Sequence, residues 1–345
     1  MKDSNYSGIA FDSLDVLVVI PTLNESRCIA SVIESLLASV PIDLKLICVV
    51  ADGGSVDGTQ AIVSEINNKN PKVILMHNPK KLQSAGVNEA VKKYGKNVKY
   101  LVRCDAHAEY PEGFIKNLIF SLENNQADSV VVPMDSIGSS GLQKAIAWVS
   151  DTVVGSGGSA HRGGHKSGFV DHGHHAAFKM SVFRATGGYD ESFSHNEDAE
   201  FDCRQRFLGY RIFLDSNNRI GYFPRDSVSG LWRQYFGYGR GRSRTVRKHP
   251  SSLRFRQLAV PVHLIISALA LISVFWFPLL MIWPIFYVLV LIYFSLKLTI
   301  KHRSLYGMVS GYVAFVMHTS WALGFITGML TLRETKWTSD NIDII

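Results

Sequence analysis

Asp105 and His107 place a carboxylate and an imidazole one residue apart, directly after an apolar stretch, 98–102, that we expect to form a buried strand. Ligands of open α/β sheets bind outside the carboxyl ends of the strands. Carboxylate oxygen suits Mg²⁺ or Mn²⁺, and imidazole suits Mn²⁺ better. An ion held here between two phosphates would neutralise the charge on a departing diphosphate. The pair predicts a diphosphate and metal site, with a plain surface turn as the alternative.

Two earlier polar segments also follow expected strands. Residues 18–25 form an apolar run that ends in Pro-Thr-Leu-Asn-Glu, where Asn24 would cap a helix. Asp52 ends the second strand and begins a turn rich in glycine, whose small residues let a ligand approach the backbone. The Asp52 carboxylate can accept from a base N–H or a ribose hydroxyl. A turn built from Asp and Gly is the alternative.

Acidic residues open an expected helix at 196–208. Glu197 and Asp198 lie in its first turn. Acidic side chains stabilise a helix N-terminus electrostatically, so capping is one interpretation. The functional interpretation makes one of them a general base that takes a proton from an attacking hydroxyl.

Alternating strand and helix patterns carry these residues up to about position 226, which predicts βαβ units and a mostly parallel sheet. Expected strands are 16–20, 44–51, 72–77, 98–102, 128–133, 174–179, 211–214 and 219–223. Expected helices are 25–38, 59–68, 84–94, 112–124 and 196–208. Residues 154–173 hold seven glycines and predict a mobile loop, of a length that often forms a lid.

The C-terminal third predicts a membrane domain. No Asp or Glu occurs from 227 to 333, and eight Arg or Lys lie within 227–256. Basic residues beside apolar spans mark the cytoplasmic side and attract anionic lipids, which makes nucleic acid the minor alternative. Residues 229–248 mix aromatics with arginines, as in a helix lying in the membrane interface. Residues 258–300 carry one charge, Lys297, and fit two spanning helices of about 20 residues with a turn near Phe277.

Residues 305–332 form a third apolar segment that spans or re-enters the membrane. His263 and His318 lie in these segments, where polar groups suggest function, the alternative being contact with a neighbouring helix. The expected organisation is a tail (1–14), an α/β domain (15–226), a basic interface segment (227–257), a membrane domain (258–332) and a tail (333–345). The four cysteines show no CxxC spacing and predict reduced thiols of a cytosolic domain. Residues 1–15 lack the apolar run of a signal peptide.

The motifs, in this order, resemble a family 2 glycosyltransferase with the GT-A fold. Segments 21–25 and 52–59 match the family's nucleotide-binding segments, and 105–107 stands in place of its DxD. Segment 187–191 followed by Glu197-Asp198 matches its acceptor-side pattern. The resemblance covers about 15–223. Within the family, segments 105–107 and 238–242 look most like ExoA-type exopolysaccharide (succinoglycan) glucosyltransferases.

The resemblance implies a role for each matched residue. Asp198 would be the catalytic base. The donor nucleotide, expected to be uridine, would contact Pro21, Thr22, Asn24, Glu25, Asp52, Lys81, Ser84, Arg103 and Asp105. Asp105 and His107 would bind a divalent metal, Mn²⁺ rather than Mg²⁺, because His107 replaces an Asp. The acceptor would contact Glu197, His175, Gly188 and Tyr189. Arg240 and Arg242 would bind a diphosphate or lipid head group, with membrane-surface attraction as the alternative.

The implied activity is inverting transfer of one sugar, expected to be glucose from UDP-glucose, to a polyprenyl-diphosphate-linked saccharide, with a β-linkage. Processive relatives carry Gln-x-x-Arg-Trp, whereas Gln234 is followed by Tyr-Phe-Gly-Tyr. The expected location is the bacterial plasma membrane, multi-pass, with the catalytic domain in the cytosol. Transfer to polyprenyl phosphate itself, or an inactive nucleotide-binding protein, are the alternatives.

Overall fold

The computed structural model describes residues 14–339 apart from 39, 42–43, 160–161 and 163. Nearly all of the expected N-terminal tail and the end of the C-terminal tail lie outside the described residues.

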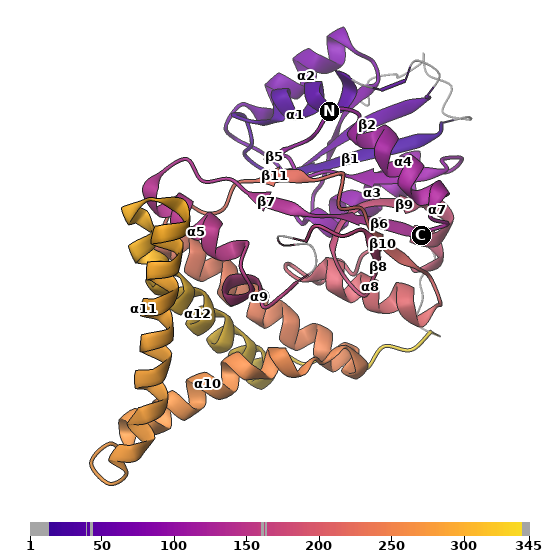
Figure 1. Cartoon of the computed structure of the whole chain (residues 1–345). Helices are drawn as coiled ribbons and strands as arrows, with labels where there is room; N and C mark the ends of the chain where they lie inside the picture. The colour runs from indigo at the N-terminus through magenta and orange to yellow at the C-terminus, as the bar shows by residue number, and fades with distance from the viewer. Residues whose placement is uncertain (1–13, 39, 42–43, 160–161, 163, 340–345) are drawn as a thin grey trace.

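An eight-stranded mixed sheet forms the centre of the α/β part, in the order β3-β2-β1-β4-β9-β6-β10-β8 (Figure 1). Its strands are β1 (Val16–Thr22), β2 (Leu46–Asp52), β3 (Val73–His77), β4 (Tyr100–Arg103), β6 (Ser129–Val132), β8 (Gly168–Val170), β9 (His174–Lys179) and β10 (Ile212–Leu214). β1 pairs in parallel with β2 and β4, whereas β9 runs antiparallel between β4 and β6. Every residue of β1 and β2 is buried, as expected for strands covered on both faces.

Helices cover both faces of this sheet, and alternate residues of β1 supply the two cores. Val16, Val18 and Ile20 belong to one apolar cluster, while Leu17 and Val19 belong to the other. The helices of the α/β part are α1 (Ile29–Ala38), α2 (Thr59–Lys69), α3 (Gln83–Tyr94), α4 (Phe114–Asn124), α7 (Met180–Ala185) and α8 (Glu197–Phe207). Elements α1 to α4 and α8 lie where the sequence patterns predict helices.

A second sheet of three short strands contains the expected strand at 219–223 and two strands that the sequence patterns did not indicate. Its order is β5 (Ala108–Glu109), β11 (Ile220–Tyr222) and β7 (Met134–Ser136). Along the chain, β7 is followed by α5 (Gly141–Ser150) and α6 (Val153–Ser156). The expectation of one mobile loop over 154–173 is wrong in part, because the segment includes most of α6 and the strand β8, which pairs with β10.

Three C-terminal helices are long and apolar enough to cross a membrane, over Phe255–Ile272, Pro278–His302 and Leu305–Thr331. They contain α10 (Phe255–Ile272), α11 (Ile282–His302) and α12 (Ser310–Thr331). In Figure 1, α10 and α11 extend away from the sheets and meet at a turn far from them. That turn holds the short 3₁₀ helix Pro278–Met281, next to the expected bend at Phe277.

The basic segment forms one long helix, α9 (Val228–Lys248), which lies against α12. Two glycines permit this contact. A Cβ at Gly239 would lie 2.1 Å from the Trp321 carbonyl oxygen, and a Cβ at Gly324 would lie 2.1 Å from that of Phe236. Backbones that approach this closely exclude any side chain, which is the use of small residues between membrane helices.

The two apolar-segment histidines join neighbouring elements. Trp283 donates to His263 Nδ1 at 2.9 Å, and His318 Nε2 donates to the Val154 carbonyl oxygen at 2.8 Å. His318 therefore links α12 to α6 through this hydrogen bond. All four cysteines are free thiols, and three of them are buried.

Candidate active site

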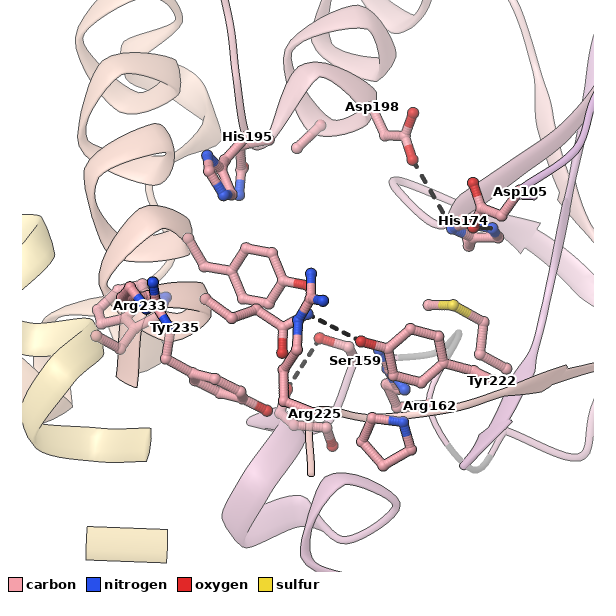
Figure 2. Close-up of a pocket in the computed structure, with 18 of the residues that line it drawn as sticks. Asp105, Ser159, Arg162, His174, His195, Asp198, Tyr222, Arg225, Arg233 and Tyr235 are labelled. Carbon is pink, nitrogen blue, oxygen red and sulfur yellow. Dashed lines mark hydrogen bonds and ion pairs between the residues drawn. The ribbon is translucent and has the colours of Figure 1, made fainter. Parts of the chain in front are cut away.

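A cavity of about 1490 Å³ opens at the carboxyl ends of β1 and β4 and extends to the C-terminal helices. Glu25, Asp105 and Asp198 line one end, and Met317 and Trp321 of α12 line the other. Figure 2 shows Asp198, His174 and Asp105 close together on one side, with arginines and tyrosines across the opening. The residues of the α/β part and of the apolar helices thus share one space.

Asp105 lies at the end of β4, between the Arg103 guanidinium and the His174 imidazole. Arg103 Nη2 is 3.0 Å from its Oδ1, and His174 Nε2 is 3.3 Å from its Oδ2. Burial alone would raise the pKa of Asp105, but Arg103 and His174 hold it below the usual range. Asp105 is therefore ionised at neutral pH, as a metal ligand must be.

His107 is oriented by Glu25, whose Oε1 lies 2.8 Å from His107 Nδ1. This hydrogen bond raises the pKa of His107. Metal-binding histidines commonly donate one ring N–H to a carboxylate and bind the ion through the other nitrogen. Glu25 therefore orients His107 in this structure, and its expected contact with the nucleotide stays a prediction.

The Asp105 and His107 pair fits a divalent ion that also binds its substrate. Among the residues that the structure describes, no group of three or more His, Cys, Asp or Glu is arranged to hold a metal. Ions of this kind are often held by one or two protein ligands plus the phosphates of the substrate. The donor set of one carboxylate and one imidazole matches that arrangement.

Asp198 lies in the first turn of α8, after Asn196 turns the chain in a left-handed conformation with φ of 70°. Its Oδ1 is 3.2 Å from His175 Nδ1, and its Oδ2 is 3.8 Å from Arg103 Nη1. Burial alone would raise the pKa of Asp198, but His175 and Arg103 hold it well below the usual range. Asp198 is thus an ionised carboxylate that faces the cavity, which a general base requires.

Glu197 beside it has the opposite character. Burial and the charge of Asp198 raise the pKa of Glu197 to about 7. Two neighbouring carboxyl groups with pKa values pushed apart are a common arrangement in acid–base sites.

The cavity gathers most of the residues that the sequence indicated. Those that line it are Asn24, Glu25, Lys81, Ser84, Arg103, Asp105, His107, Glu197, Asp198 and Arg242. Those that do not are Pro21, Thr22, Asp52, His175, Gly188, Tyr189 and Arg240.

Asp52 holds its own turn together. Its Oδ1 accepts from the backbone N–H groups of Gly54 and Ser55, both at 2.9 Å, and from Gln60 Nε2 at 2.7 Å. These hydrogen bonds match the alternative in which the motif is a turn built from Asp and Gly. A direct contact between Asp52 and the nucleotide stays a prediction. Pro21 and Thr22 are buried in β1, where Thr22 donates to the Ile20 carbonyl oxygen.

His175, Gly188 and Tyr189 are buried and lie outside the cavity lining. His175 contacts both Asp198 and Tyr189. His175 therefore supports the residue expected to act as base, and contact of these three residues with the acceptor stays a prediction.

An arginine-rich wall of the cavity consists of Arg242, which the sequence indicated, and of four arginines that it did not: Arg162, Arg225, Arg233 and Arg256. Arg162 lies 4.5 Å from the ring centre of Tyr222, and Figure 2 shows Arg225 beside them, with Arg233 farther along near Tyr235. The signal available for Arg233 and Arg256 was the basic stretch at 227–256, in which only Arg240 and Arg242 were expected to bind a diphosphate or lipid head group. Arg162 and Arg225 lie outside that stretch. Burial and the charge of Arg256 lower the pKa of Arg242 to about 10. Its Nε is buried and has no hydrogen bond among the described residues.

Comparisons with known proteins agree with this geometry. The model of Glycosyl transferase family 2 matches residues 17–187. The chain is 40% identical over 325 residues to the succinoglycan biosynthesis protein ExoA of Rhizobium meliloti (strain 1021), covering 93% of this chain and 97% of that protein.

Two more distant proteins extend the comparison. The chain is 22% identical over 335 residues, 93% of its length and 98% of the other's, to the dolichyl N-acetyl-alpha-D-glucosaminyl phosphate 3-beta-D-2,3-diacetamido-2,3-dideoxy-beta-D-glucuronosyltransferase of Methanococcus voltae. The mannosyltransferase PcManGT from Pyrobaculum calidifontis, solved with GDP-Man and Mn²⁺, superimposes with a TM-score of 0.63 at 16% identity, covering 93% of this chain and 88% of that one. The fold is a mixed α/β, GT-A-like sheet domain followed by three long apolar helices. The chain belongs to glycosyltransferase family 2, the enzymes that transfer sugars.

Proposed function

We propose that this enzyme transfers a sugar from a UDP-sugar, expected to be UDP-glucose, to a saccharide carried on polyprenyl diphosphate. The observation that supports this is the single cavity that joins Asp105 and Asp198 to Met317 and Trp321 of an apolar helix. Similarity to a protein of succinoglycan biosynthesis supports a place in exopolysaccharide assembly. The catalytic domain would face the cytosol of a bacterium, with the C-terminal helices in the plasma membrane.

Asp198 would act as the base of an inverting displacement. Its Oδ2 takes the proton of an acceptor hydroxyl while that oxygen forms a bond to the anomeric carbon. The bond from this carbon to the diphosphate breaks on the opposite face, so the configuration inverts and a β-linkage results from an α-linked donor. Arg103 and Lys81 line the donor end, where positive charge stabilises the departing diphosphate.

Asp105 and His107 would hold a divalent cation, with Mn²⁺ the better fit to the imidazole. When bound, the ion neutralises charge on the donor diphosphate. PcManGT contains Mn²⁺ together with a nucleotide sugar, which supports the same use here.

The arginine-rich wall suits the acceptor's diphosphate, because guanidinium groups bind phosphate through paired hydrogen bonds. The unpartnered Nε of Arg242 supports this assignment. Arg240, also expected to bind phosphate, does not line the cavity. Val260 and Met317 would contact the start of the isoprenoid chain. The Methanococcus voltae relative is named for an acceptor sugar on a lipid phosphate, which fits this direction of entry.

A donor screen tests the proposal. Full-length protein in nanodiscs is given UDP- and GDP-sugars with a polyprenyl-diphosphate-linked saccharide, and both nucleotide release and the product are measured. We expect release and β-linked product with one UDP-sugar, one residue added per acceptor, and none with Asp198→Asn. Transfer to polyprenyl phosphate alone, or an active Asp198→Asn variant, would contradict the proposal.

A further inference from the structure

A buried imidazole lies behind the proposed base. His175, on β9, has no exposed surface. Its Nδ1 is 3.2 Å from Asp198 Oδ1, and its Nε2 is 2.7 Å from Asp202 Oδ1. Asp202 is buried as completely as His175.

The spacing of two aspartates on α8 explains why a positively charged imidazole is needed between them. Asp198 and Asp202 are four residues apart on α8, so their side chains lie on one face, where like charges repel. Phe178 and Phe201 pack edge-on against the His175 ring and exclude water from it. Two carboxylates in such surroundings require a cation between them.

The charged groups around His175 favour its protonated form. Burial would lower the pKa of His175, but Asp202 and Asp198 raise it to about 10. The remaining polar neighbour is Tyr189, whose hydroxyl lies 2.8 Å from His175 Nδ1. On the cavity side, Asp198 Oδ2 lies 3.8 Å from Arg103 Nη1 of β4 and 4.0 Å from His174 Nδ1 of β9, and Glu197 is its neighbour in α8.

Asp202 is itself fixed from the entry to β9. Its Oδ2 lies 2.7 Å from His172 Nδ1 and accepts from the Gly173 backbone N–H at 3.3 Å. His172 and Gly173 line the cavity, whereas Asp202 does not. A chain of contacts therefore runs from His172 and Gly173 at the cavity wall to Asp202, from Asp202 to His175, and from His175 to Asp198 Oδ1.

We propose that His175, held by Asp202, is the positioning residue of the base: an imidazolium that binds Asp198 Oδ1 from behind and leaves Oδ2 to receive the acceptor's proton. This inference rests on the proposed role of Asp198. His175 keeps its own protons throughout the reaction. The Oδ1 atom of Asp198 has no hydrogen bond among the described residues, so the charge of His175 is its main stabilisation.

The test uses His175→Gln and Asp202→Asn in the full-length protein, with His77→Gln as control, because His77 is exposed at the end of β3 and away from the cavity. We expect kcat at pH 7 to fall about tenfold to hundredfold in both variants, with the dissociation constant of the nucleotide sugar unchanged. The acidic limb of the kcat profile should move to higher pH, since Asp198 loses the charge that keeps it ionised. His77→Gln should change neither quantity.

Two further measurements separate this inference from the proposed function. In an Asp198→Asn background, Asp202→Asn should cost nothing more, because it acts through Asp198. A fall in kcat without movement of the acidic limb, or full additivity with Asp198→Asn, would overturn the positioning role. Should both variants fail to fold, ¹⁵N-histidine spectra of the wild-type protein decide: an imidazolium that persists at pH 8 supports the inference, and its absence overturns it. An active Asp198→Asn variant would instead overturn the assignment of the base.

Discussion

Arg103 links the donor and acceptor ends of the site through one side chain, which is 5% exposed. Its Nη2 lies 3.0 Å from Asp105, and its Nη1 lies 3.8 Å from Asp198. Burial would lower the pKa of Arg103, but the two carboxylates raise it. A fixed positive charge between them keeps both carboxylates ionised, so the proposed metal ligand and the proposed base would be ready at the same pH.

Chelation tests the donor end of the site. EDTA should weaken binding of the nucleotide sugar about tenfold or more, and Mn²⁺ should restore it better than Mg²⁺, because His107 favours Mn²⁺. Isothermal titration calorimetry measures the dissociation constant. His107→Ala should remove the response to Mn²⁺, while His77→Ala should keep it. Donor binding that is indifferent to EDTA would exclude the metal assignment.

The raised pKa of Glu197 predicts that its contribution to the stability of the protein is lost as the pH rises. Its pKa is raised from 4.5 to about 7 in the folded protein, so the folded state holds this proton more tightly than the unfolded chain. The stabilisation is complete below pH 4.5 and is lost as the pH rises through 7. Glu197→Gln stays neutral, so its unfolding temperature relative to the wild type should increase between pH 4.5 and 7.5.

The control for this prediction is Glu65→Gln. Glu65 is exposed on α2, where Lys69 lowers its pKa. This variant should show no such gain over the same pH interval. An equal response of both variants would mean that Glu197 does not retain its proton.

At the scale of elements, the contact between α9 and α12 sets the distance between the site and the apolar helices, of which α12 is one. Tyr238 and Arg242 of α9 line the cavity together with Trp321 of α12. Both helices contribute a glycine to their contact, and the backbone carbonyls of Phe236 and Trp321 occupy the space that a Cβ would need. The position of the part of the cavity that α9 and α12 line therefore depends on two glycines, Gly239 and Gly324.

Substituting Gly324 tests this contact. Gly324→Val should lower the free energy of unfolding by about 1–3 kcal/mol, because the two helices must separate to admit the side chain. Thermal unfolding in detergent measures the effect. Gly168→Val is the matched control, since a Cβ at Gly168 would meet nothing within 4 Å. Equal free energies of unfolding for the two variants would show that α9 and α12 leave room for a side chain at Gly324.

At the scale of the whole molecule, hydrophobic patterning was enough to predict the α/β arrangement and the apolar helices, because each depends on local periodicity. It missed α5, a short helix that packs against α12, since such helices depend on tertiary contacts rather than on propensity. The positions of Asp105 and Asp198 at element ends also followed from local pattern. Their supporting residues did not: His175 reaches Asp198 because α8 packs on β9, with Phe201 against His175 and Phe178, which is a tertiary contact that local pattern does not show.

The same long-range packing decides which predicted residues reach the cavity. Asp52 follows a strand just as Asp105 does, yet it turns into its own loop, whereas Asp105 lines the cavity. The arginine-rich wall is assembled from the segment that holds Arg162, the turn at Arg225 and the helix of Arg233, which no local motif brings together.

The most direct test of the account compares one saccharide in two forms, linked to polyprenyl diphosphate or free in solution, as acceptors for the same UDP-sugar. Full-length enzyme in nanodiscs is used, and kcat/KM is measured for each acceptor. If the cavity joins the sheet edge to the membrane helices, the lipid-linked form should be preferred by at least about a hundredfold, since the diphosphate and isoprenoid contacts both contribute binding energy. Equal kcat/KM values for the two acceptors would contradict the account.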